Sequence, residues 1–198
     1  DGRGRISGRV AAAVAPAAAK VAAGSSAAVK GSLMIANPRL WGPSPQQQPN
    51  RYVAVTTVSQ GGRAVDRYET RFGVRSLSFK PDGLYVNGER IQIKGVNMHH
   101  DLGAVGAAFN LRAAERQLEI LREIGCNAIR TAHNPPAPEL LELTDRMGFL
   151  VMDEIFDAWV RQKTPFDFHL VFDDWHEQDL RAFMRRDRNH PSVFLWSV

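Results

Sequence analysis

The chain has 198 residues, of which 44% are hydrophobic and 23% are charged, so it can form one domain and part of a second. No run of about 18 apolar residues occurs in the sequence, which argues against a membrane-spanning helix. Residues 1–5 hold no Met and precede alanines instead of a leucine-rich segment, so we expect no signal peptide there and leave the compartment open. The one cysteine, Cys126, cannot form an internal disulfide or a thiolate metal site alone.

Charge divides the chain into two chemically different segments that meet near Pro81. Residues 1–80 contain 12 Lys and Arg against 3 Asp and Glu, whereas residues 81–198 contain 13 against 18. The basic residues of the first segment are spread singly, which favours a solvated surface over a nucleic-acid interface. We therefore expect neither nucleic acid nor a membrane as a partner.

The first segment has the pattern of β structure. Residues 52–58 alternate and are rich in β-branched side chains, and a turn at Gly61-Gly62 returns the chain to Phe72, as in a hairpin of a sandwich. Residues 33–35 form another apolar run that we read as a strand. The alanines of residues 10–29 favour a helix, but Pro16 interrupts them, so we predict short strands there.

The second segment changes to a rhythm of strand and helix. We predict strands over residues 91–96, 127–130, 149–152 and 193–198. Capping residues and stop signals mark the ends of the helices between them. Asn110 can cap the first of these helices, whose apolar residues recur at helical spacing. Such alternation indicates a parallel sheet, either an open doubly wound sheet or the first half of an eight-fold barrel.

Polar residues follow three successive strands of this predicted sheet. They are Asn97, His99, His100 and Asp101, then Arg130 and His133, then Asp153, Glu154 and Asp157. Carboxyl ends of neighbouring parallel strands meet at one face, so these groups predict a ligand site there. For any one of these residues, a structural role is the alternative to ligand binding. A lone His is often structural, and Arg130 with Glu154 can be a simple buried ion pair.

Sugar binding and metal binding both suit these residue types. Imidazole, guanidinium and carboxylate groups pair well with hydroxyls, and Trp159 and Trp196 offer stacking faces. Trp175 lies on a predicted helix, and we expect its side chain to pack in the protein core. A divalent metal is the alternative, but no His-x-His or His-x-x-x-His pair supports it. The chain also lacks a Gly-x-Gly-x-x-Gly loop, a phosphate loop and a Gly-x-Ser-x-Gly motif.

Several motifs follow one another along the chain in a recognisable order. They are Phe72-Gly73-Val74-Arg75, Asn87-Gly88, Lys94-Gly95-Val96-Asn97-Met98-His99-His100, Asn127-Ala128-Ile129-Arg130-Thr131-Ala132-His133-Asn134-Pro135, Met152-Asp153-Glu154 and Asp187-Arg188-Asn189-His190-Pro191-Ser192-Val193. In order and spacing they resemble glycoside hydrolase family 2, which includes β-galactosidases, β-glucuronidases and β-mannosidases. The resemblance implies an immunoglobulin-like β-sandwich over residues 1–79, followed over residues 80–198 by the first half of a (β/α)8 TIM barrel.

The resemblance also implies retaining hydrolysis by two carboxylates. In the family the acid/base glutamate follows the Trp-Ser-x strand and the nucleophile lies later, so we expect no catalytic residue before Val198 and no hydrolysis by this polypeptide alone. By family position, His99 and His133 would bind sugar hydroxyls, and Arg130 would orient a catalytic carboxylate. The remaining site candidates, Asp153, Glu154 and Asp157, would be pocket groups.

The stretch 153–159 looks most like the β-galactosidase branch, so β-galactosides are the expected substrates and β-glucuronides or β-mannosides the alternatives. Two other classes stay open: a metal-dependent barrel hydrolase and a non-catalytic carbohydrate-binding or interaction module. We assign no cofactor, and leave a divalent cation and a homo-oligomer as open features of the full-length enzyme. A half barrel would expose strand edges, so we expect the isolated chain to self-associate.

Overall fold

The computed structural model describes residues 10–198, and the chain divides into two compact units, Asp1–Pro38 and Arg39–Val198. In the first unit, residues 10–38 form no helix or strand, and most of their side chains are exposed. The strands predicted within residues 10–29 and over residues 33–35 are therefore wrong. Apolar alternation stabilises a strand only when a neighbouring strand supplies hydrogen bonds, and these residues have no such neighbour. The expectation about residues 1–5 lies outside the described residues.

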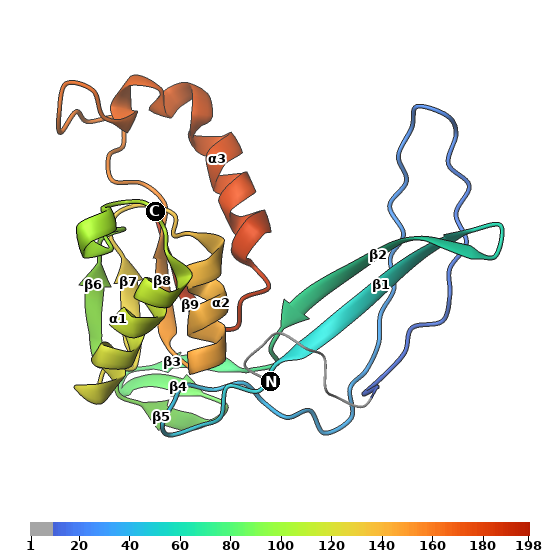
Figure 1. Ribbon diagram of the computed structural model, residues 1–198, viewed down its shortest axis with the longest axis horizontal. Coiled ribbons are helices and arrows are strands. Elements are labelled where there is room, and N and C mark those ends of the chain that lie inside the picture. Colours follow the sequence, from blue (N-terminus) through green and yellow to red (C-terminus); the bar gives the residue numbers. More distant parts are fainter. Residues whose placement is uncertain (1–9) are drawn as a thin grey trace. The chain divides into compact units, whose positions relative to one another are not determined.

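The second unit begins with two small antiparallel sheets. Strands β1 (Tyr52–Gln60) and β2 (Arg63–Phe72) form the predicted hairpin, in which Gly61 and Gly62 both have positive φ, as a two-residue turn of this kind requires. A second sheet follows, made of β3 (Leu77–Lys80), β4 (Gly83–Val86) and β5 (Glu89–Ile91). Figure 1 shows this three-stranded sheet below the ends of the larger sheet.

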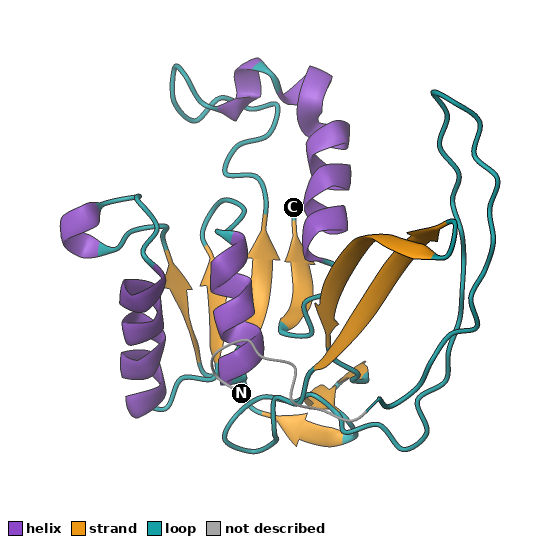
Figure 2. Cartoon of the chain, turned by 45° about the vertical axis from the view of Figure 1, so that its right-hand side comes forward, coloured by secondary structure: helices purple, strands orange, loops and turns teal. Residues whose placement is uncertain are grey.

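The larger sheet has four parallel strands in chain order. They are β6 (Gly95–Met98), β7 (Ala128–Thr131), β8 (Leu150–Glu154) and β9 (Val193–Ser197). Figure 2 shows the four arrows side by side and pointing the same way. Order and direction agree with the first half of a barrel. The continuous strand predicted over residues 91–96 is wrong, because the chain there divides into β5 and β6.

Three helices connect these strands. They are α1 (Leu111–Glu123), α2 (Pro138–Met147) and α3 (Phe172–Asp187), with short 3-10 turns at η1 (Gly103–Val105) and η2 (Phe168–Leu170). Asn110 caps α1 as predicted, since its side chain accepts a hydrogen bond from Ala113 N. Gly148 ends α2 in the left-handed conformation. Among the described residues, no helix combines the length and apolarity needed to span a membrane.

The two faces of the parallel sheet are covered differently. On one face, Ile129, Val151 and Val193 pack with side chains of α1 and α2. On the other face, Ala128 and Leu150 pack against Trp41 and the sheet β3–β5. Ala128 and Leu150 are the first residues of their strands, so this second core closes the amino ends of the sheet. The carboxyl ends on that same face are left for polar side chains.

A buried polar network holds the start of β9 to α2. Asp145 accepts hydrogen bonds from Ser192 N at 3.1 Å and Ser192 Oγ at 2.6 Å, and its second oxygen lies 2.6 Å from His190 Nδ1. Trp41 Nε1 donates to the backbone oxygen of Asp145 at 2.8 Å. Arg75 donates to the backbone oxygens of Pro191 and Val193. The motif before β9 therefore has a structural role at the base of the sheet.

Candidate functional site

The carboxyl ends of β6, β7 and β8 bring three polar residues to one face. Asn97 in β6 is in register with Arg130 in β7, and Arg130 is in register with Met152, two residues before Glu154 in β8. Side chains alternate along a strand, so residues two apart point the same way. Asn97, Arg130 and Glu154 consequently share the face whose amino end the sheet β3–β5 closes.

Glu154 is the centre of this cluster. Its side chain is only 5% exposed, and Arg130 donates to it twice, from Nε to Oε2 at 2.6 Å and from Nη2 to Oε1 at 2.8 Å. His133 Nδ1 lies 2.7 Å from Glu154 Oε1. A paired carboxylate of this kind is a strong and geometrically specific hydrogen-bond acceptor. Glu154 thereby fixes both Arg130 and His133 in place.

The position of His133 determines which ring nitrogen can meet a ligand. Its Nδ1 lies near the acceptor Glu154 and, at 3.1 Å, near the donor Arg130 Nη2. We assign a proton to Nδ1, because the ionised carboxylate can only accept and its contact is the shorter. In the neutral ring Nε2 then has a free lone pair, and in the charged ring it is a donor. Either form suits a sugar hydroxyl.

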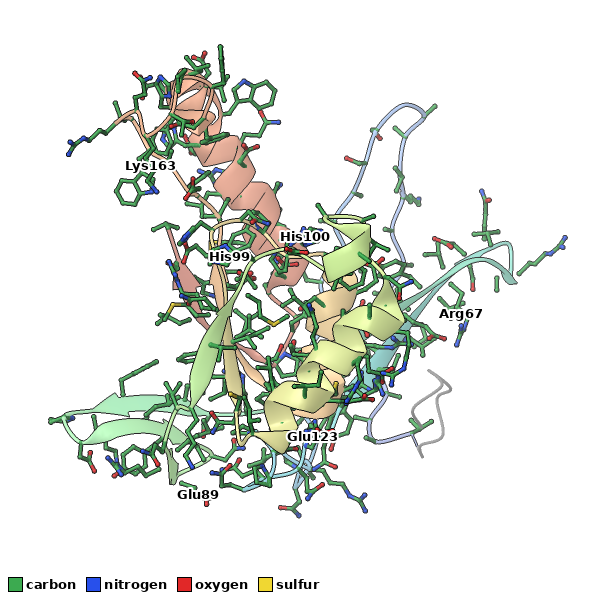
Figure 3. The ribbon with its side chains drawn as sticks, turned by 60° about the vertical axis from the view of Figure 1, so that its left-hand side comes forward. Arg67, Glu89, His99, His100, Glu123 and Lys163 are labelled. Carbon is green, nitrogen blue, oxygen red and sulfur yellow. The ribbon has the colours of Figure 1, made fainter. Side chains whose placement is uncertain are left out.

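His99 lies beside this cluster. Its ring centroid is 5.6 Å from that of His133, in an edge-to-face arrangement, and its side chain is exposed. Figure 3 shows His99 and His100 at the carboxyl end of β6. The structure thus brings together His99, Arg130, His133 and Glu154. They are four of the six residues predicted to bind substrate, and the other two are Asp153 and Asp157.

Three further residues support the cluster. Asn97 is among the polar residues that the sequence places at the strand ends, whereas Thr131 and Ser197 are not. Asn97 Oδ1 lies 3.4 Å from Arg130 Nη1, and Ser197 Oγ donates to Glu154 Oε2 at 3.2 Å. Thr131 Oγ1 accepts from the backbone N–H of Glu154 at 3.0 Å. Ser197 stands opposite Glu154 in the β8–β9 register. Strand register is the signal that identifies Thr131 and Ser197, and a single sequence shows it only once strand pairing is assumed.

Asp153 does not join the cluster. It precedes Glu154 directly, so alternation directs it to the helix-facing side of β8, where it is 0% exposed. Its register partner, Trp196, packs against Phe183 of α3 with ring centroids 5.2 Å apart. Burial, and then the nearby charge of Asp187, raise the pKa of Asp153 to about 7.

Asp157 also lies apart from the cluster, in the loop between β8 and α3. Its carboxylate pairs with Lys163 Nζ at 3.1 Å, and both side chains are more than half exposed. A hollow of about 550 Å³ opens there, lined by Asp157, Trp159, Arg161, Gln162 and Lys163. Figure 3 shows Lys163 on this loop, beyond the strand ends.

The tryptophans differ in their surroundings. Trp159 is 53% exposed and stacks on Phe172 with ring centroids 6.4 Å apart, so one of its faces is available to a ligand. Trp196 is partly buried, packs against the core and meets the ring of Phe183 edge-to-face. The prediction of core packing for Trp175 is wrong, because its side chain is about half exposed on α3.

A second, smaller cavity of about 30 Å³ lies between β6 and α1, with His99, His100 and Phe109 among its lining. That volume suits about one water molecule. This cavity is therefore too small for a sugar ring. Over residues 10–198, no three His, Cys, Asp or Glu side chains gather as metal ligands.

Comparison with known proteins identifies the family. Residues 77–198 match the family model described as "Glycosyl hydrolases family 2, TIM barrel domain", and residues 3–75 match the one described as "Glycosyl hydrolases family 2". The chain belongs to glycoside hydrolase family 2. The predicted fold class, a sandwich followed by the start of a TIM barrel, is confirmed by these matches.

The relatives agree with this family membership. The chain is 51% identical over 177 residues to a β-galactosidase, BoGH2A, of Bacteroides ovatus, covering 89% of this chain and 20% of that protein. It is 32% identical over 179 residues to a human β-glucuronidase, covering 88% of this chain and 27% of that protein. A solved β-glycosidase structure from Bacteroides vulgatus superposes with a TM-score of 0.79 at 40% identity, covering 83% of this chain and 21% of that one. The chain spans about a fifth of the length of the first curated relatives it matches.

Proposed function

We propose that the cluster of His99, Arg130, His133 and Glu154 binds the terminal sugar of a β-glycoside, and that a whole enzyme containing this chain is a retaining β-glycosidase. The observation that carries the proposal is the convergence of these four side chains at the carboxyl ends of adjacent strands. In barrels of this kind, that end holds the active site. Family membership supports the same reaction class.

The chemistry of the cluster suits recognition of hydroxyl groups. His133 Nε2 and the ring nitrogens of His99 meet a ligand from one side, and Arg130 Nη1 adds N–H donors next to them. Because Glu154 already receives the donors of Arg130 and His133, the rings and the guanidinium are oriented before a ligand arrives. Preorganised donors lose little entropy on binding.

The same geometry assigns this cluster to binding and not to bond cleavage. Retaining hydrolysis needs two carboxyl groups about 5–5.5 Å apart. Within the described part of the chain, Glu154 is the only carboxylate of the cluster, and it is occupied by Arg130, His133 and Ser197. We therefore propose that Arg130 Nη1 orients a catalytic carboxylate that is not among the four residues of the cluster.

We propose β-galactosides as the substrates. The support is the 51% identity to a β-galactosidase of Bacteroides ovatus. β-Glucuronides are the second candidate, since the human β-glucuronidase is also similar at 32% identity. The two sugars differ at the group that carries a carboxylate in glucuronides, so a substrate comparison separates them. The division of the chain at residues 79/80 stays a proposal too.

The test compares nitrophenyl β-galactoside with nitrophenyl β-glucuronide, using a whole enzyme of family length that contains these 198 residues. We expect hydrolysis of the galactoside with retention of configuration, and loss of most kcat/KM in His133→Ala. His176→Ala, on α3 and outside the cluster, is the matched control and should keep full activity. Hydrolysis of neither substrate, or equal activity of His133→Ala and wild type, contradicts the proposal.

A further inference from the structure

Asp153 is a buried carboxyl group with no ordinary partner. It is completely buried on the helix-facing side of β8, and neither of its oxygens has a hydrogen-bond donor among the described residues. An ionised carboxylate in such a place is costly, because it gives up water and gains no donor in return. Either a proton or a donor must complete this site.

The groups that face Asp153 come from α3 and from the turn after it. Asp187 is also completely buried, and Arg186 donates to its two oxygens, from Nε and Nη2, each at 2.6 Å. His190 faces Asp153 as well, but its Nδ1 is engaged by Asp145 of α2 at 2.6 Å. The neighbours thus supply two cations, and the hydrogen bonds of both are directed to other carboxylates.

Asp153 and Asp187 are neighbouring hydrogen-bond acceptors with no donor between them, and one proton shared by the two carboxyl groups satisfies both. Burial, followed by the charge and contact of Asp187, raises the pKa of Asp153 to about 7 against the opposing charges of Arg186 and His190. Asp187 already has the two donors of Arg186, so Asp153 is the member of the pair that carries the proton. The pair then holds one negative charge next to one guanidinium.

We propose that Asp153 is a carboxylic acid that donates a hydrogen bond to the Asp187 carboxylate. Through this bond, the last turn of α3 fixes the carboxyl end of β8. Asp153 is therefore a positioning residue for Glu154, a role that rests on the proposed function of the sugar-binding cluster.

The link from Asp153 to the cluster is short. Asp153 and Glu154 share a peptide unit, whose N–H donates to Thr131 Oγ1 at 3.0 Å. When Asp153 loses its proton, two buried like charges repel each other, and the end of β8 is displaced from α3. Any such shift moves the carboxylate that orients Arg130 and His133.

The first experiment follows the aspartate carboxyl carbons of the isotope-labelled full chain by NMR from about pH 5 to about pH 9. We expect one aspartate with a midpoint near 7. This signal is absent in Asp153→Asn, and its midpoint falls in Asp187→Asn. The wild-type titration decides by itself if a variant fails to fold: absence of any aspartate midpoint between about pH 6 and about pH 8 overturns the proposal.

The second experiment measures unfolding of wild type and Asp153→Asn against pH. Asparagine donates to Asp187 at every pH, so it imitates the protonated acid. The pKa of Asp153 is raised on folding, so its stabilising contribution is complete below the unfolded value of 3.8 and is lost as pH rises through about 7. The unfolding constant of wild type relative to the variant should rise about tenfold per pH unit between about pH 5 and about pH 7, then level off. Parallel profiles overturn the proposal.

The third experiment tests the positioning role by galactose binding to the same proteins. The ionised fraction of Asp153 rises from about 10% at about pH 6 to about 90% at about pH 8, and the Kd of wild type should rise with it. Asp153→Asn should lack this component, whereas the exposed Asp173→Asn of α3 should keep it. Equal profiles in all three overturn the positioning role. If the carboxyl titrates as expected but no protein binds sugar, the proposed function fails and the shared proton stands.

Discussion

Replacement of Glu154 by glutamine tests the ion pair at the centre of the cluster. The Glu154→Gln variant would keep the shape of the side chain, but it would lose the charge and place an NH2 group against the donors of Arg130 or His133. Breaking a buried ion pair by removing one partner costs about 3–5 kcal/mol. Arg130 is 32% exposed, so water can partly solvate the freed guanidinium. We therefore expect a loss near the lower limit, about 3 kcal/mol, or about 150-fold in the unfolding equilibrium.

The matched control is Glu177→Gln on α3. Arg181 donates to Glu177 at 2.6 Å and 3.1 Å, the same pairing of side chains, but the two are 64% and 70% exposed. Exposed pairs contribute little to stability, so Glu177→Gln should unfold as wild type does. The assay is urea unfolding followed by tryptophan fluorescence, with the three proteins measured at one pH and ionic strength. Equal stability of the two variants would refute the reasoning.

Three further predictions concern the elements that support the site. Gly148→Ala should destabilise the chain by about 1–3 kcal/mol in the same assay. The reason is that Gly148 has φ +75° and that an added Cβ would lie 2.6 Å from Ser44 Oγ; Gly125→Ala, with positive φ and open space, should cost less. Asn110→Ala should cost about 1 kcal/mol by loss of the helix cap, and Asn110→Asp should restore most of it. Burial lowers the pKa of His190, but the hydrogen bond and charge of Asp145 outweigh this effect and raise it. The stability that protonated His190 contributes is complete below its ordinary pKa of 6.5 and is lost as pH rises through the raised value, so unfolding of His190→Gln should lack this component of the pH dependence.

The helices of the barrel segment are readable from the sequence because their signals are local. Asn110 caps α1, Pro138 starts α2 and Gly148 ends it, each through its own backbone or side-chain chemistry. The turn at Gly61-Gly62 is local in the same way. Such features depend on residues a few positions apart, which the sequence displays.

The misplaced strands depend on contacts that are distant in the chain. Over residues 91–96, the side chain of Asn127 accepts from Lys94 N at 2.8 Å and donates to Gln92 O at 2.9 Å. These bonds replace sheet hydrogen bonds and separate β5 from β6. The alternation of the sequence carries no sign of that partner. The same reasoning applies to residues 10–29, where apolar residues alone do not supply a neighbouring strand.

The site could be predicted from the sequence only as far as the order of the strands in the sheet could be predicted. His99, Arg130 and His133 follow successive strands, so parallel pairing brings them together. The separation of Asp153 from Glu154 follows from alternation along β8, once the strand is known to continue to residue 154. Because the strand was predicted to end at residue 152, the sequence did not show that Asp153 and Glu154 point to opposite faces of the sheet.

The most direct test of the sugar-binding cluster is a titration of the chain with galactose, observed by NMR of labelled histidine rings. His99 and His133 should shift together with one Kd, because their rings lie 5.6 Å apart and would meet the same sugar. His169 and His176 lie outside the cluster and should not shift. Signals of His99 and His133 that stay fixed, or that report two different Kd values, would contradict a shared sugar site at the ends of these strands.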